Sequence, residues 1–247
     1  MIRIFIAFLA AGLVWVTAGC SEDKCKNVSC QNGGACVDGT CNCVNGFKGD
    51  RCQTAPTCKL LSEKDVFFYA WDGDKLTKIT DDGGFELTFN YDASGKITSW
   101  SEKQGSATSS TGTITYGSSP EEILKIEFSD GSKYEHTYSG GKVVQCKYYS
   151  SSTASPTTTT YEYDANGNVT KLTEGTLTIN YLYDTGKKNP WSAFPVASKL
   201  LFSLPYTFGP HAPVSSTRTD GSPETWSWTG ANEYGYPTAN GYVYNCN

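Results

Sequence analysis

The chain has 247 residues, ten cysteines and a formal net charge of −5 at pH 7. Without a run of basic residues it lacks the electrostatic footprint of a protein that binds nucleic acid or an anionic membrane surface. Its 16 tyrosines, 25 glycines and single methionine favour a mainly β protein with little helix, because aromatic residues are enriched in strands and glycine in turns.

Residues 1–19 have the pattern of an export signal. Arg3 supplies a positive start, and an uncharged apolar run extends from Ile4 to Val16. This run is shorter than the roughly 20 residues that a spanning helix needs. Small residues then precede Cys20, a pattern that resembles the lipobox of bacterial lipoproteins. The resemblance implies cleavage before Cys20 and lipid chains such as palmitate on that residue, and an ordinary secretory signal is the alternative.

Residues 20–24 form a short tether behind the lipobox. Glu22 and Asp23 make this stretch acidic, which resembles the surface-export signal of Bacteroidota lipoproteins. That resemblance implies a lipid-anchored protein in the outer membrane that faces the cell exterior. The alternative is a solvated tether whose charges only keep it flexible.

Six cysteines lie within residues 25–52. In an exported chain such a cluster implies a disulfide framework, and zinc bound at Cys41 and Cys43 is the chemical alternative. The spacing, with Gly46, Phe47 and Gly49 before the last cysteine, resembles an EGF-like domain. The resemblance implies the pairs Cys25 with Cys36, Cys30 with Cys41, and Cys43 with Cys52.

Calcium is a ligand of many EGF-like domains, but this segment departs from the calcium-binding pattern. The loop between Cys36 and Cys41 lacks the expected aromatic residue. We therefore predict no bound metal and no cofactor, and interpret the segment as a spacer or contact module.

Residues 53–57 form a polar linker, and a second domain is expected over residues 58–247. Its clearest unit runs from Tyr161 to Leu172, where apolar and polar residues alternate around an Asn-Gly turn. This pattern is typical of a β-hairpin. Similar units recur every 20 to 25 residues, which predicts one hairpin per repeat and a long antiparallel meander. We use as repeat markers Trp71, Tyr91, Tyr116, Tyr138, Tyr163 and Tyr183.

The Tyr-Asp-x-x-Gly motif of these units resembles the YD repeats of Rhs and teneurin proteins. Tyr91 and Tyr163 begin the two best copies. The resemblance implies a fold but no activity, and six copies are too few to close the hollow shell of the large relatives. Aspartates in the turns are expected to accept backbone hydrogen bonds.

A proline-rich apolar insertion near residues 190–213 interrupts the repeats. We expect a short helical or irregular segment that covers an edge or face of the sheet. Long loops often carry function. The aromatic residues of the insertion, together with two tryptophans further along the chain, are therefore a candidate binding surface. The alternative is that they only cover the core. The candidates are Trp191, Phe194, Phe202, Tyr206, Phe208, Trp226 and Trp228.

Cys58, Cys146 and Cys246 can form at most one bridge, and we favour Cys58 with Cys246. The two histidines, His136 and His211, lie outside any recognisable catalytic motif. We therefore predict a non-enzymatic lipoprotein that takes part in a protein complex of the outer membrane or cell surface. A glycan-binding accessory lipoprotein or weak glycoside hydrolase is the alternative.

Overall fold

The computed structural model describes residues 23–44, 46–221, 223–239 and 241–246. The predicted signal segment and Cys20 lie outside these residues. The described chain forms two compact units, one ending at Thr54 and the other beginning at Ala55. No helix within the described ranges combines the length and apolar character needed to cross a bilayer.

The N-terminal unit is a small hairpin held by disulfides. Strands β1 (Ala35–Val37) and β2 (Thr40–Asn42) pair around a turn in which Asp38 and Gly39 both have positive φ, as a two-residue hairpin turn requires. So short a unit cannot bury enough apolar surface to fold unaided, and covalent bridges replace a core. The bridges are the three that the EGF-like resemblance implies: Cys25 with Cys36, Cys30 with Cys41, and Cys43 with Cys52.

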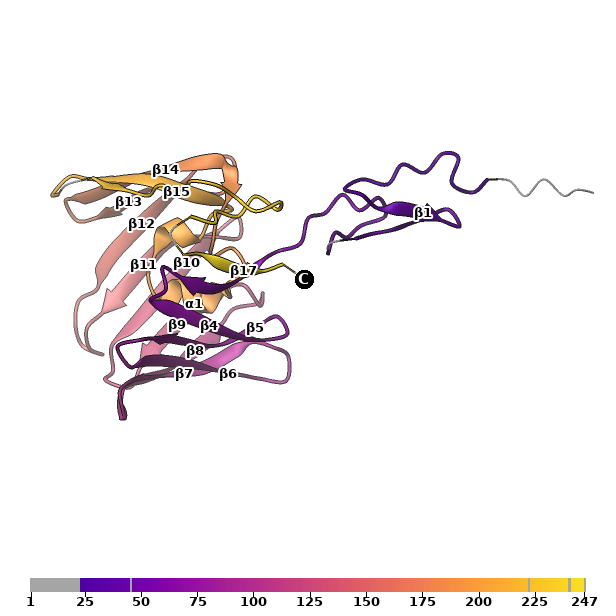
Figure 1. Ribbon diagram of the computed structural model, residues 1–247. Helices are drawn as coiled ribbons and strands as arrows, with labels where there is room; N and C mark the ends of the chain where they lie inside the picture. The colour runs from indigo at the N-terminus through magenta and orange to yellow at the C-terminus, as the bar shows by residue number, and fades with distance from the viewer. Residues whose placement is uncertain (1–22, 45, 222, 240, 247) are drawn as a thin grey trace, which may run out of the picture. The chain divides into compact units, whose positions relative to one another are not determined.

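The C-terminal unit is one antiparallel sheet of 15 strands (Figure 1). Neighbours in the sheet follow chain order from β3 to β16, and β17 returns to pair with β3. The expected mainly β meander is thus confirmed. The strands are β3 (Lys59–Glu63), β4 (Phe67–Asp72), β5 (Lys75–Asp81), β6 (Phe85–Tyr91), β7 (Ile97–Gln104), β8 (Ala107–Tyr116), β9 (Ile123–Phe128), β10 (Lys133–Ser139), β11 (Lys142–Tyr149), β12 (Thr157–Tyr163), β13 (Val169–Glu174), β14 (Leu177–Lys188), β15 (His211–Arg218), β16 (Glu224–Thr225) and β17 (Val243–Asn245).

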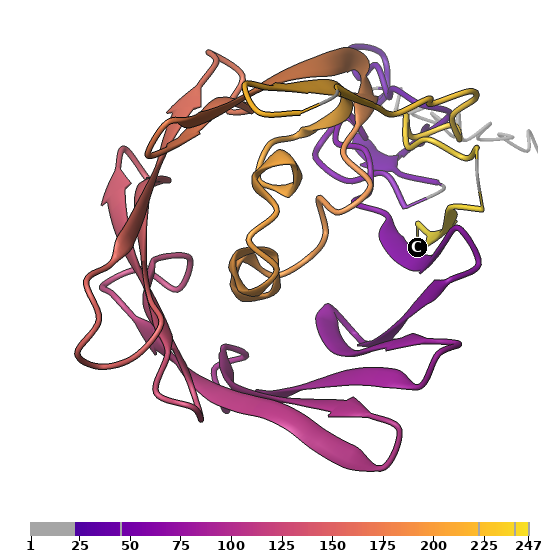
Figure 2. The same cartoon turned by 90° about the vertical axis from the view of Figure 1, so that its left-hand side faces the viewer.

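The sheet curves around the insertion, which lies on its concave side (Figure 2). The insertion contains α1 (Val196–Leu201) and the 3-10 helix η1 (Pro205–Thr207), so the expected short helical segment is confirmed. Among the described residues, the end strands β16 and β17 each pair with a single neighbour.

The core fills the space between the concave face and the insertion. Leu200 of α1 and Phe194 just before it are buried against large apolar side chains of the sheet. Gly112 of β8 allows the Trp100 ring to lie over the neighbouring strand, because a Cβ at Gly112 would overlap that ring. The sheet's own fully buried members include Leu60, Leu76, Ile97, Trp100, Ile123, Ile126 and Val169.

Candidate functional site

The six repeat markers occupy the same place in successive hairpins. Each lies in an even-numbered strand, from β4 to β14, and the pairing register shifts immediately before it. The first five lie toward the ends of their strands, whereas Tyr183 lies in the middle of the longer β14. Such a shift is a β-bulge, which disrupts the regular hydrogen-bond ladder. The repeat therefore places one aromatic side chain beside each bulge, at the same end of successive strands.

The polar end of each marker side chain bonds to the backbone of the preceding hairpin. Tyr163 donates its hydroxyl hydrogen to the Val143 carbonyl at 2.7 Å, and Val143 pairs with the preceding marker, Tyr138. Only at Tyr138 is the direction reversed, since a backbone N–H donates to the hydroxyl. The equivalent bonds are Trp71 to Leu60 (2.8 Å), Tyr91 to Leu76 (2.7 Å), Tyr116 to Ile97 (2.9 Å), Ile123 to Tyr138 (2.9 Å) and Tyr183 to Val169 (2.8 Å).

Three lysines lie over the rings of three markers. Each lies at or directly before the start of the strand that follows one marker, and its ammonium lies over the ring of the next marker, in the arrangement of a cation–π contact. Within the described ranges, none of the three has a carboxylate at ion-pair distance. We call this set the lysine–tyrosine row: Lys75 over Tyr91 (5.4 Å from nitrogen to ring centroid), Lys96 over Tyr116 (5.1 Å) and Lys142 over Tyr163 (5.1 Å).

Two adjacent hollows separate the row from the insertion. The larger, about 610 Å³, is lined by Lys75, Lys96 and their tyrosines, and the smaller, about 220 Å³, by Lys142 and Tyr163. Both are also lined by Glu121, Val196 and Lys199. We call the two hollows together the row groove.

Aspartates stabilise two of the turns that follow markers, one of them next to Lys96 of the row. Asp92 accepts hydrogen bonds from the backbone N–H groups of Lys96 (3.0 Å) and Ser94 (2.9 Å). These hydrogen bonds, above all the one from Lys96, hold the pKa of Asp92 below its usual range. Asp164 accepts in the same way from Asn168 at 2.9 Å. The carboxylates thus fix turn geometry, as turn aspartates commonly do.

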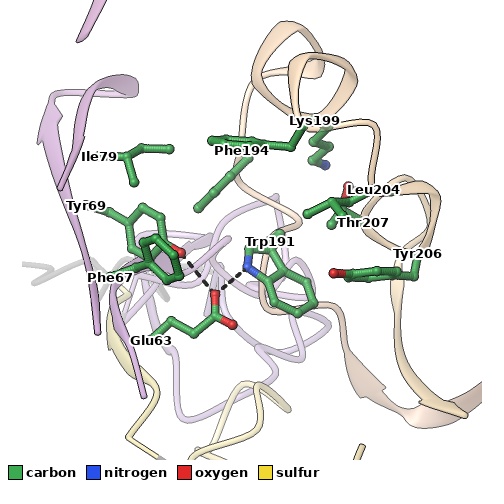
Figure 3. A pocket seen from close by; sticks show the side chains of 11 residues that line it. Glu63, Phe67, Tyr69, Ile79, Trp191, Phe194, Lys199, Leu204, Tyr206 and Thr207 are labelled. Carbon is green, nitrogen blue, oxygen red and sulfur yellow. Dashed lines mark hydrogen bonds between the residues drawn. The ribbon is translucent and has the colours of Figure 1, made fainter. Parts of the chain in front are cut away.

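A separate cavity of about 190 Å³ lies between β4 and the insertion (Figure 3). Glu63 lines one side, where its Oε2 accepts hydrogen bonds from the Tyr69 hydroxyl and the Trp191 indole N–H, both at 3.0 Å. Its Oε1 accepts from the Tyr242 hydroxyl at 3.0 Å. Lys199 lines the cavity from α1.

The predicted aromatic surface is mostly part of the core. Trp191, Phe194 and Trp228 are 7 to 8% exposed, so they cannot present a free surface. Trp191 and Trp228 pack edge-to-face at 6.5 Å, and Trp228 packs on Tyr242 at 5.3 Å. Covering the core is thus their role. Among the remaining candidates, Phe202 is exposed. The other three are partly buried: Tyr206, Phe208 and Trp226.

Cys58 and Cys246 are bonded to each other, 188 residues apart in sequence. This bridge joins the beginning of the C-terminal unit to the end of its returning strand. Cys146 is the free cysteine of the described chain, and it is buried.

Cys146 lies directly opposite His136 in the pairing of β10 with β11. Burial raises the pKa of the Cys146 thiol to about 12 and lowers the pKa of His136 to about 4. Both groups are therefore neutral at pH 7. An activated nucleophile needs the opposite arrangement, a thiolate beside a charged or basic partner, so this pair offers no catalytic thiolate.

Sequence reasoning missed the lysines and Glu63, but four of its candidate aromatic residues line the cavity: Trp191, Phe194, Phe202 and Tyr206. The row lysines did leave a signal, because Lys75, Lys96 and Lys142 each directly precede the first buried apolar residue of the next strand. Lys199 also stands out as the one charge inside the apolar stretch of the insertion. Glu63 left no signal, since its partner Trp191 lies 128 residues further along the chain.

The fold and these features define a class of architecture, a strongly curved antiparallel meander with an internal helical insertion. No family model matches the chain. Among solved structures, it is similar to a chain of the Photorhabdus luminescens Tc holotoxin pore, with 20% identity and a TM-score of 0.33 over 49% of this chain and 6% of that one. It is also similar to a porin-like protein from Bacteroides uniformis, with 14% identity and a TM-score of 0.38 over 68% of this chain and 91% of that one.

Proposed function

We propose that this chain is a non-enzymatic binding module, held on the outer membrane by lipid on Cys20, which binds an acidic segment of a protein partner in the row groove. The observation that carries the proposal is the row itself. Three half-buried lysines line one groove without a carboxylate partner in the described chain, although the protein as a whole is acidic. A locally basic groove of this kind attracts negative ligands.

Charge recognition is favoured over sugar stacking by the state of the tyrosine rings. A sugar that stacks on an aromatic residue needs a free ring face. One face of Tyr91, Tyr116 and Tyr163 is already covered by a lysine ammonium, and Trp228 is buried. The groove then offers lysine charges spaced along successive hairpins, which outnumber the two acidic residues in its lining, Asp74 and Glu121.

The binding part of the proposal is tested with a fluorescent glutamate-rich peptide and the purified mature protein. Exposed ion pairs contribute about 0.5 kcal/mol each, so losing three should weaken binding about tenfold. The test variant is the triple change Lys75→Gln, Lys96→Gln and Lys142→Gln, measured by fluorescence anisotropy. We expect its affinity to depend less on salt than that of the unchanged protein.

The matched control removes the same number of charges outside the groove. Lys125, Lys133 and Lys171 pair with glutamates on their own sheet, and changing all three to Gln should alter peptide affinity less than twofold. Equal losses in the two triple variants would contradict the proposal. Tighter binding of polygalacturonate than of a peptide of equal charge would instead support an acidic glycan as the partner.

The anchoring part rests on the lipobox resemblance and is tested separately. Cells that express the chain are labelled with palmitate, and the Cys20→Ser variant is compared with the unchanged protein. We expect the variant to lose the label and to appear in the medium or the soluble fraction. Equal labelling of both proteins would refute a lipid anchor at this position.

A further inference from the structure

Lys199 has an unusual environment for a lysine. It belongs to α1, inside the curve of the sheet, and Figure 3 shows its side chain directed into the cavity beside Phe194 and Leu204. Its ammonium donates to the Ser192 carbonyl at 3.2 Å, and no ion pair joins it to any described carboxylate. Burial lowers the pKa of Lys199 to about 8, so the amine is still mostly charged at pH 7.

The hydrogen-bonding capacity of Lys199 is only partly used. An ammonium group has three N–H donors, and Ser192 takes one of them. Even a partly buried cation without a carboxylate is costly unless another group compensates its charge. An anionic group of a ligand would therefore bind most favourably where the Lys199 ammonium faces the cavity.

Glu63, the carboxylate across the cavity, does not supply that compensation. Three neutral donors, from Tyr69, Trp191 and Tyr242, already hold its two oxygens. These bonds hold the Glu63 carboxylate, so the charge of the Lys199 ammonium remains available to an anionic ligand.

The remaining walls are apolar and largely aromatic. Phe194 packs edge-to-face on Tyr69 with ring centroids 5.0 Å apart, and Trp191 does the same with Tyr206 at 5.6 Å. Such contacts fix the orientation of the rings, so the walls of the cavity are already formed without a ligand. The cavity is open to solvent along its edge, where three lining side chains are exposed: Phe67, Phe202 and Leu204.

The volume of the cavity limits the size of the ligand that it can hold. An apolar cavity of about 150 Å³ holds a benzene molecule, and this one measures about 190 Å³. We propose that the cavity binds a small monoanion with a single ring, such as an aromatic carboxylate, with its ring between Phe194 and Tyr206 and its carboxylate on the Lys199 ammonium. Lys199 and Phe194 also line the row groove, but the proposal concerns a different ligand and does not depend on the function proposed for that groove.

The test compares benzoate with benzyl alcohol, a neutral probe of similar shape, by isothermal titration calorimetry at pH 7. The mature unchanged protein should bind benzoate at least about tenfold more tightly, the factor that corresponds to one charge-assisted hydrogen bond. In Lys199→Met, which keeps the length of the side chain but not its charge, that preference should disappear. An unchanged preference in this variant, or no preference in the original protein, would overturn the proposal.

Two further variants separate a lost site from a lost fold. Lys96→Met removes a lysine from the row and should leave benzoate affinity unchanged. Leu204→Trp fills the cavity from an exposed position, and should abolish binding of both probes while the thermal unfolding midpoint stays within a few degrees. Benzoate binding that survives Leu204→Trp would place the site elsewhere and refute the assignment.

Discussion

Cys146 shows how burial controls the chemistry of a single residue. Its thiol lies between two strands and its pKa is raised to about 12. Because the thiolate is the reactive form, we predict that iodoacetamide at pH 8 leaves Cys146 unmodified in the folded protein. Among the cysteines from Cys25 to Cys246, mass spectrometry should find one alkylated residue, and only after unfolding without reductant. Rapid labelling of the folded protein would contradict the burial described here.

His136 predicts a pH dependence of stability. Burial lowers its pKa from 6.5 to about 4, so between these two values the unfolded state binds more protons than the folded state. The contribution of His136 is therefore fully present above pH 6.5 and is lost as the pH falls through about 4. The unfolding free energy of the original protein, measured relative to that of His136→Leu, should fall by about 3 kcal/mol from pH 7 to pH 4.

Urea denaturation at a series of pH values measures this difference. Carboxylates titrate in the same range, but they do so in both proteins and cancel in the comparison. Parallel curves for the two proteins would show that His136 is not held neutral by burial.

At the residue scale, the sequence predicted contacts between residues that lie close together along the chain and missed most of those between distant residues. The disulfide pairing of the N-terminal unit was implied by the resemblance of a local cysteine pattern to EGF-like domains, and its partners are 9 to 11 residues apart. The partners of Glu63 come from positions up to 179 residues away, and no local pattern encodes them.

At the scale of elements, the repeat period predicted the hairpins correctly because alternation and turn residues are local signals. The bulges were not predicted, since the extra residue of a bulge is one among the 20 to 25 that separate successive markers and carries no signature of its own in the sequence. The bulges explain why tyrosine is favoured at the marker positions. Its ring covers the neighbouring hairpin, and its hydroxyl reaches a backbone group beside the previous bulge.

Tyr163→Phe tests this role of the markers. The change keeps the ring but removes the hydrogen bond to the Val143 carbonyl, which belongs to a buried residue. We expect a loss of about 1 to 2 kcal/mol in unfolding free energy, the usual cost of leaving a buried polar group unsatisfied. Tyr148→Phe, at an exposed position, is the control and should cost less than about 0.5 kcal/mol. Equal effects would show that the marker hydroxyl is dispensable.

At the scale of the whole C-terminal unit, the sheet curves until its two ends come near the same insertion. Strand twist accumulates over many neighbours, and the apolar insertion gives the concave face something to pack against. The sequence predicted an insertion that covers the sheet. It did not predict that the sheet would curve around it, because curvature results from packing over all the strands together.

The Cys58–Cys246 bridge holds the ends of this unit together across 188 residues. In the chain-entropy model, closing so long a loop stabilises the folded state by about 5 kcal/mol. Replacing both cysteines by alanine should lower the unfolding free energy by several kcal/mol in urea titrations. Cys146→Ala removes a buried sulfur but no bridge, and should cost about 1 kcal/mol. A double variant no less stable than this control would show that the bridge contributes little.

The lysine–tyrosine row is the feature on which the proposed function depends, and reversal of its charge tests it most directly. The measurement is the affinity of the triple variant Lys75→Glu, Lys96→Glu and Lys142→Glu for a glutamate-rich and a lysine-rich peptide of equal length. The unchanged protein should prefer the glutamate-rich peptide, and the variant should prefer the lysine-rich one. A variant that keeps the original preference would contradict recognition of an acidic partner by this groove.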